Sequence, residues 1–332
     1  MMETNNMGNA NQQIQPQDSS DIFAESQAAY FNLLAVFNER CGMLRNQESV
    51  DFNPVMESLS RIVSILKKDD RMLLGLANAP YSYISHHTGD SLSEMVVISG
   101  VNVMIYSLKI SYEFGVTDNH LLYVGIAGLC NNIGLLDAES GADSQEKLEN
   151  LRKTEEYEIN AKKYIRKIKI DNFHTESIEF LNTLAKSEKN MLSKTSLQES
   201  MYQYAIIIHL CGEFVKLTHK GSFGEIMTPI DAMKRIRGEM NSYFNQDIVK
   251  LFFNKLSIYP LGSFVKLSSG ETAKIVGINE NFIMRPLIYV VIDGDGREKL
   301  PPLKINLREK PNIYIKHAVI NEELTERFIT LY

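Results

Sequence analysis

The sequence has no excess of positive charge and no long apolar run. Its 35 Lys and Arg residues are outnumbered by 41 Asp and Glu, which gives a net charge of -6 and a pI of about 5.7. Without a positive field over the whole chain, we expect neither a nucleic-acid polymer nor an anionic membrane surface as a partner. The longest apolar stretches, 95–98 and 101–105, fall well short of the roughly 20 residues that a membrane span needs.

Cysteine is also scarce, and the beginning of the chain has almost no large apolar residue. The three cysteines, Cys41, Cys130 and Cys211, lie far apart among apolar neighbours and form no C-x-x-C pair. They are expected to be buried, reduced thiols, which indicates a cytoplasmic protein. Residues 1–20 are rich in Asn, Gln, Ser and Asp and lack the basic and apolar regions of a signal peptide, so we expect a disordered polar tail.

The remaining composition is that of a globular protein, with 44% hydrophobic and 23% charged residues, and the apolar pattern is mostly helical. Residues 21–76 predict two amphipathic helices separated near 46–54. Residues 95–114 are apolar on nearly all sides, as expected of a helix at the centre of a bundle. Asp118 can cap the next helix, 120–130. Further helices are predicted within 141–169 and at 173–184, 197–218, 230–240 and 245–256, with Thr228 and Asn245 as start signals.

After Pro260 the pattern changes to short runs rich in β-branched residues. Residues 263–267, 272–278 and 287–292 predict strands joined by tight turns. The sequence Gly294-Asp295-Gly296 is explained as a hairpin turn, and its similarity to a calcium loop is superficial. Because its alternating apolar residues need a partner surface, we expect residues 262–307 to form an ordered β unit packed on the last helices.

Several stretches resemble the HD-GYP branch of the HD phosphohydrolase superfamily. The resemblance covers about residues 55–306 and implies a mainly α fold, an HD-type helical bundle with an N-terminal helical extension and a small C-terminal β appendage. The expected domains are a tail (1–20), an N-terminal helical region (21–76), a degenerate HD-GYP-like domain (77–257) and a β-rich appendage (258–332). The stretches that carry the resemblance are 101–108, Glu113-Phe114-Gly115-Val116, Gly125–Gly134, the Ile-Tyr-Pro-Leu-Gly-Ser segment 258–263 with its continuation to 267, Gly270, and Arg285-Pro286.

Proteins of this family hydrolyse cyclic di-GMP at a site with two or three metal ions, which bind the phosphodiester and lower the pKa of an attacking water. In this chain the residues at the matching positions have changed. The family's first histidine falls on Ser99, its His-Asp doublet on Asn131 and Asn132, and its later aspartate on Gly212. The lysine that follows the doublet in the family falls on Leu135. The histidine of the family's H-P element falls near Thr154, and its H-H-E stretch falls on 185–188. The family's GYP loop is absent.

The loss of these ligands predicts a protein without catalytic residues and without a bound metal. An Asn carbonyl is a poor substitute for a carboxylate or an imidazole, and Gly212 offers no donor at all. Two adjacent dications would therefore be left almost uncompensated. Ser99, Asn131, Asn132, Gly212 and Thr154 are accordingly interpreted as vestigial metal-site positions, and Leu135 as a vestigial lysine position.

A second possibility is that the ligands have moved. His86 and His87 precede Ser99 by about a dozen residues, and an insertion there would displace the first histidine and allow a manganese or iron site. Against this, adjacent imidazoles on an extended segment point to opposite sides and seldom share a metal. Glu213 lies about 100° round the helix from Gly212, which points it elsewhere.

The other histidines are given structural interpretations. His209 lies in an apolar run and is expected to be a hydrogen-bonded core residue, whereas His219 is expected at a helix end, favoured by the helix dipole. His120, His174 and His317 show no ligand spacing.

One local basic face interrupts the acidic chain. Lys162, Lys163, Arg166, Lys167 and Lys169 could meet a phosphate-bearing ligand or an acidic partner. Interleaving with Glu155, Glu156 and Glu158 favours the simpler interpretation, an exposed helix face.

The leading hypothesis is a catalytically inactive HD-GYP-like protein that acts as a signalling or assembly module through protein contacts. One alternative is an effector that binds cyclic di-GMP without cutting it, and another is a phosphodiesterase with relocated metal ligands. The sequence does not identify the protein partner, and it leaves a homodimer open.

Overall fold

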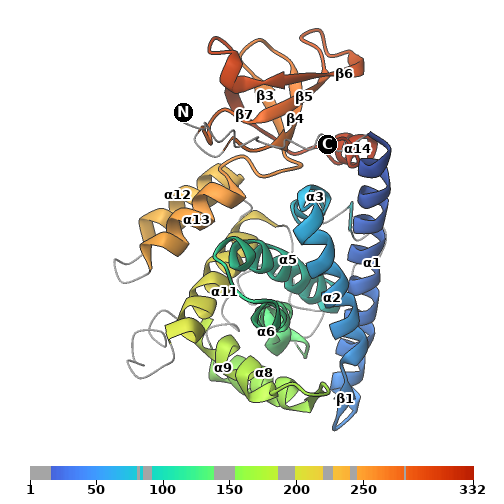
Figure 1. Ribbon diagram of the computed structural model, residues 1–332, viewed down its shortest axis with the longest axis vertical. Coiled ribbons are helices and arrows are strands. Elements are labelled where there is room, and N and C mark those ends of the chain that lie inside the picture. The colour runs from blue at the N-terminus through green and yellow to red at the C-terminus, as the bar shows by residue number, and fades with distance from the viewer. Residues whose placement is uncertain are drawn as a thin grey trace, which may run out of the picture.

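The computed structural model describes residues 16–80, 83–84, 92–137, 154–185, 199–219, 227–239, 245–279 and 282–332. It consists of a helical body below a five-stranded sheet (Figure 1). The fold is therefore mainly helical with a C-terminal antiparallel β unit, as the sequence predicted. The expectation of a disordered tail is wrong for residues 16–20, because helix α1 begins at Pro16, ahead of the apolar pattern that predicted it. Residues 1–15 lie outside the described residues.

The N-terminal region forms three helices where the apolar pattern predicted two. The additional one is short, and its buried residues include Leu73 and Leu76. A two-residue strand after α1 pairs in parallel with the strand that follows α8, Val50 with Ile168. The elements are α1 (Pro16–Asn46), β1 (Val50–Asp51), α2 (Asn53–Lys68), α3 (Arg71–Ala77) and, after α8, β2 (Ile168–Lys169).

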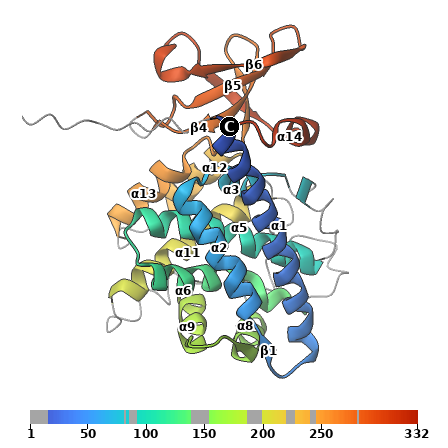
Figure 2. The same ribbon diagram turned by 45° about the vertical axis from the view of Figure 1, so that its right-hand side comes forward.

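Helix α5 (Leu92–Glu113) is at the centre of the body, where it contacts α1, α3, α6, α11 and α13 (Figures 1 and 2). Among the described residues, one segment is long and apolar enough to cross a membrane, Glu94–Glu113 in this helix. Of its apolar window, 83% is buried inside the protein, as in the core helix of a folded domain. The expectation of a central, buried helix is confirmed.

The other body helices follow the predicted order. They are α6 (Asp118–Leu129), the 3-10 helix η1 (Cys130–Leu135), α8 (Glu155–Lys167), α9 (Thr175–Ala185), α11 (Glu199–Thr218), α12 (Pro229–Glu239) and α13 (Gln246–Leu256). Two predicted caps are confirmed, because Thr228 Oγ1 accepts from the Asp231 amide and Asn245 Oδ1 accepts from the Asp247 amide. The expected cap at Asp118 is wrong. Thr117 holds that position without a side-chain bond, and Asp118 pairs with Lys67.

The β unit is an antiparallel sheet in the order β6-β5-β4-β3-β7. Its elements are β3 (Phe264–Leu267), β4 (Thr272–Gly277), β5 (Leu287–Ile292), β6 (Glu298–Asn306), η2 (Leu307–Glu309), β7 (Ile315–Val319) and α14 (Glu322–Phe328). The interpretation of 294–296 as a turn is supported, since Asp293 Oδ1 accepts from the amides of Asp295 and Arg297 at 3.0 and 2.8 Å.

The core runs through both parts of the molecule. One face of the sheet, including Val265, Ile275 and Ile288, belongs to the same buried cluster as Leu33 of α1 and Val101 of α5. The opposite face packs its Phe264 against α14 and the residues that follow it. The expected ordered β unit is thus present, and α14 covers the face that the helical body leaves open. All three cysteines are buried and free, as expected.

Candidate functional site

Two glycines bring the backbones of α5 and α6 into direct contact. A Cβ atom on Gly100 would lie 2.4 Å from the carbonyl oxygen of Leu129, and one on Gly128 would lie 2.9 Å from Cα of Met104. Any larger residue at either position would force the helices apart. This close crossing places the part of α5 that carries Ser99 beside η1, which carries Asn131 and Asn132.

Four of the positions predicted to be vestigial come together at this point. Asn132 Nδ2 donates a hydrogen bond of 2.7 Å to Ser99 Oγ. From α11, a Cβ on Gly212 would lie 3.2 Å from Nδ2 and 3.4 Å from Oδ1 of Asn131. The three side chains are nearly inaccessible, with exposed fractions of 4% for Ser99 and Asn131 and 2% for Asn132. We call these four residues the vestigial cluster.

The other two vestigial positions lie outside this cluster. Thr154 is exposed and caps α8, where its Oγ1 accepts from the amide of Tyr157 at 3.3 Å. Leu135 is fully buried at the end of η1. From α8 it is Tyr157 that reaches the cluster, because its hydroxyl donates to the carbonyl oxygen of Asn131 at 2.8 Å. Thr154, the position matched to a metal-ligating histidine of the family, therefore lies outside the cluster.

Sequence reasoning also missed Asn182. Its Nδ2 donates to the carbonyl oxygen of Cys130 at 2.8 Å, in a fully buried contact. Together with Tyr157 it fixes the turn that carries the two cluster asparagines. No motif marks either residue. The signal for each residue was a polar or amphipathic side chain on the inner face of its helix. This signal is weak when the position of the neighbouring backbone is unknown.

The cluster is chemically neutral. Its side chains are one hydroxyl and two amides, of which Asn132 donates to Ser99, and such neutral groups are poor ligands for dications. Within the described ranges, no group of three or more His, Cys, Asp or Glu side chains is placed to hold a metal ion. His86, His87 and residues 186–188 lie outside the described residues.

The described histidines make contacts of a structural kind. His209 Nδ1 lies 2.9 Å from the carbonyl oxygen of Ala185, in agreement with the hydrogen-bonded interpretation, although the residue is only partly buried. His120 Nδ1 lies 2.9 Å from the Tyr204 hydroxyl, linking α6 to α11. His174 and His317 are exposed.

The expected position of His219 at a helix end is confirmed, but its burial opposes the positive charge that the helix dipole would favour. The residue follows the end of α11 but is buried, with Nε2 2.5 Å from the carbonyl oxygen of Ala77 and Nδ1 2.9 Å from Thr218 Oγ1. Burial lowers its pKa, and the hydrogen bonds to the backbone oppose this shift incompletely. The neutral ring is therefore favoured, and the helix dipole does not dominate.

This burial predicts a loss of stability in mild acid. A His whose pKa is lower in the folded protein contributes fully above its unfolded pKa, near 6.5, and its contribution falls by up to about 1.4 kcal/mol per pH unit below that. Urea unfolding at pH 7.5 and 5.5 should show a smaller pH-dependent loss for His219→Gln than for the parent protein. The exposed variant His317→Gln is the control. Equal losses in all three proteins would refute the assignment.

The basic face on α8 is largely engaged within the protein. Arg166 binds both carboxylate oxygens of Glu179 at 2.8 Å, and Lys167 Nζ donates to the carbonyl oxygen of Leu44 at 2.9 Å. Lys163 lies 3.8 Å from Asp137. These contacts favour the interpretation as a solvated helix face that also holds α8 in place.

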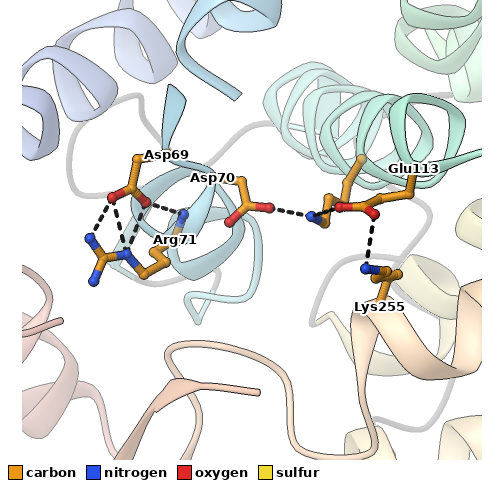
Figure 3. Close-up of polar contacts among 6 residues, drawn as sticks. Asp69, Asp70, Arg71, Glu113 and Lys255 are labelled. Carbon is orange, nitrogen blue, oxygen red and sulfur yellow. Dashed lines mark hydrogen bonds and ion pairs between the residues drawn. The ribbon is translucent and has the colours of Figure 1, made fainter. Parts of the chain in front are cut away.

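A chain of alternating charges joins α3, α5 and α13 near the sheet (Figure 3). Lys109 binds Asp70 and Glu113 at 2.5 Å each, and Glu113 binds Lys255 at 2.9 Å. Burial would lower the pKa of Lys109, but the two carboxylates outweigh it and raise that pKa. Burial would likewise raise the pKa of Glu113, and the two ammonium groups reverse this and lower it. The network fixes three helices at the end of the body from which the β unit starts.

One comparison with known proteins gives a match. Residues 264–327 match the family model described as a KOW domain associated with HD domain. The matched segment begins with β3 and ends inside α14, so it contains the whole sheet. The chain therefore carries a C-terminal unit similar to one that accompanies HD domains. No curated protein and no solved structure matches the chain.

Proposed function

We propose that this chain is a non-catalytic HD-type module that acts through protein contacts. The observation that supports the proposal is the vestigial cluster. Ser99, Asn131, Asn132 and Gly212 lie together, yet their side chains are neutral and buried against one another. The match of the β unit to an HD-associated domain supports the HD part of the proposal independently of these positions.

The physical argument against a metal centre here is one of charge and ligand chemistry. Two dications need anionic ligands around them, and each dication left without them would pay a large desolvation penalty. The direct Asn132–Ser99 bond and the contact distance between Gly212 and Asn131 leave these groups packed against each other. With the present side chains, this place therefore offers a dication no anionic ligand.

Hydrolysis of cyclic di-GMP or of a simple phosphodiester should therefore stay at background when manganese, iron or magnesium is added. Metal analysis of the purified protein and a product assay measure this. Turnover that persists in Asn131→Ala and His86→Ala variants would indicate a contaminating enzyme. Turnover that these variants abolish would contradict the proposal and support relocated ligands. Calorimetric titration with cyclic di-GMP separates a binding effector from a module without this ligand.

The β unit offers the surface for protein contacts. Eight large apolar side chains are exposed among the described residues, and six of them lie between 282 and 320. Exposed apolar residues on one unit are candidates for an interaction surface, because a partner that covers them removes apolar area from water. The six are Phe282, Met284, Leu300, Leu303, Tyr314 and Ile320.

The partner proposal is tested by quantitative capture with the full chain as bait. The double variant Phe282→Ser and Tyr314→Ser should lose any protein that the parent captures specifically. Ile159→Ser is the matched control, since Ile159 is 57% exposed but lies on α8, away from the β unit. Equal capture by the parent, the double variant and the control would contradict the proposed surface.

A further inference from the structure

A lysine occupies the middle of a row of five residues across the sheet, between aromatic neighbours on both sides. The strand registers align Val319, Phe264, Lys274, Tyr289 and Lys304 from β7 to β6. These five residues point to the face that α14 covers, where Phe264 packs with α14. Lys304, at the edge, is exposed above the Tyr289 ring, whereas Lys274 has an exposed fraction of 0%.

The ammonium group of Lys274 is held by residues 328–332. Its Nζ donates to the carbonyl oxygens of Phe328, Ile329 and Leu331 at 2.8, 2.9 and 3.0 Å, and it lies 3.7 Å from the centroid of the Tyr332 ring. Carbonyls that follow the last turn of a helix have no partner within that helix. Three such acceptors and one aromatic face are what a buried ammonium group requires.

The two sides of this contact depend on each other. Burial lowers the pKa of Lys274 well below its usual range, so the charged form needs its acceptors in place. The carbonyls of Ile329 and Leu331 would in turn lose this donor if Lys274 were replaced by an apolar residue, whereas the carbonyl of Phe328 also accepts from the Leu331 amide at 3.0 Å. Neither group is well accommodated without the other, which makes seating of the segment cooperative.

The same segment reaches the helical body. The Tyr332 ring lies 5.5 Å from the ring of Phe23 in α1. Its hydroxyl occupies the space beside Gly75 of α3, where a Cβ would approach it to 1.4 Å, and a Cβ on Gly262 would lie 3.2 Å from it. In both views α14 lies beside the beginning of α1, below the sheet (Figures 1 and 2). The segment thus contacts the sheet, α1 and α3 together.

We propose that residues 321–332 are a detachable latch that fastens the sheet to α1 and α3, with the buried ammonium group of Lys274 as its catch. When the latch leaves, the face of the sheet around Phe264 and Val291 becomes exposed, and the contacts of Tyr332 with α1 and α3 are lost. The family match ends at residue 327, before every backbone carbonyl that Lys274 binds. The inference does not depend on the proposed function.

Hydrogen exchange on the full chain tests the latch. In Lys274→Met, which keeps an unbranched side chain one atom shorter and removes its charge, amides of 321–332 should exchange about ten times faster or more, while α5 and α6 keep their protection. Lys304→Met removes a charge from the same row at its exposed edge and should leave the exchange unchanged. Unchanged protection of 321–332 in Lys274→Met, or a parallel rise along the whole chain, would overturn the proposal.

A second pair of variants tests the latch without altering the lysine. Tyr332→Ala removes the ring that contacts Lys274 and Phe23, and it should raise both exchange in 321–332 and the binding of a fluorescent apolar dye. Tyr332→Phe removes just the hydroxyl, which has no hydrogen-bond partner among the described residues, and it should behave like the parent. Equal dye binding and exchange for Ala and Phe would overturn the proposal even if Lys274→Met does not fold.

Discussion

A variant with Ser99→His, Asn131→His, Asn132→Asp and Gly212→Asp should bind about one divalent metal ion per chain where the parent binds none. The four positions already lie together, with Asn132 2.7 Å from Ser99 and the Cβ direction of Gly212 leading to Asn131. Imidazoles and carboxylates at these positions would supply the donors that manganese and iron prefer. The missing property is therefore ligand chemistry and not helix placement.

The expected stabilisation is large. A metal ion at 100 times its Kd adds about 2.7 kcal/mol to the free energy of unfolding, which is visible as a raised Tm. Without metal the same variant should be less stable than the parent, because new carboxylates are buried without a counter-ion. Metal content by mass spectrometry and thermal unfolding with and without manganese measure both effects.

The control is the double variant Asn131→His and Asn132→Asp, which supplies donors from one short element alone. It should bind manganese more weakly than the quadruple variant, since ligands from α5 and α11 are then absent. A folded quadruple variant that binds no more metal than the parent would show that the helices do not present these side chains to a common point. The HD-type framework would then be in doubt. Catalysis is not expected to return, because the variant still has Leu135 at the position of the family's lysine and still lacks the GYP loop.

Strong local signals made most of the helical body predictable. The apolar residues of 95–114 and the capping residues Thr228 and Asn245 act within a few residues of their own positions, and the corresponding helices are present. The third N-terminal helix was missed because α3 has just seven residues, too few for a clear period. Asp118 was misassigned because its partner, Lys67, is distant in sequence.

The β unit was predictable in its centre and not at its edges. Strands β4 and β5 are buried and rich in β-branched residues, whereas β6 contains Pro301 and Pro302 and is the edge of the sheet, where proline is tolerated. Lys274 illustrates the same limit. Its place in an alternating strand indicates a solvent-facing side chain, and it is buried because α14 returns to cover that face.

The candidate site was predictable as a set of positions but not as an arrangement of contacts. The resemblance gave Ser99, Asn131, Asn132 and Gly212, which the structure brings together. It also gave Thr154, which is an exposed helix cap. The bonds that Tyr157 and Asn182 make depend on the close approach of several helices, which no local pattern encodes.

The second large effect is expected at the α5–α6 crossing. Gly100→Ala should destabilise the protein by about 3 kcal/mol, the upper end of the usual cost of overpacking a core. The new methyl group would lie 2.4 Å from the carbonyl oxygen of Leu129. That neighbour is backbone within a packed helix, so it has no rotamer to change. Relief requires α5 and α6 to separate, which also lengthens the Asn132–Ser99 hydrogen bond.

Gly42→Ala is the matched control, because it makes the same chemical change in the opposite environment. Gly42 is exposed in α1, and a Cβ there has nothing within 4 Å. Alanine should stabilise the protein by about 0.5 to 1 kcal/mol, since glycine loses more backbone entropy in a helix. Urea unfolding followed by far-UV circular dichroism should therefore move the two midpoints in opposite directions. A Gly100→Ala midpoint equal to that of the parent would mean that the helices cross at a greater distance, and the convergence of α5 with η1 would lose its structural basis.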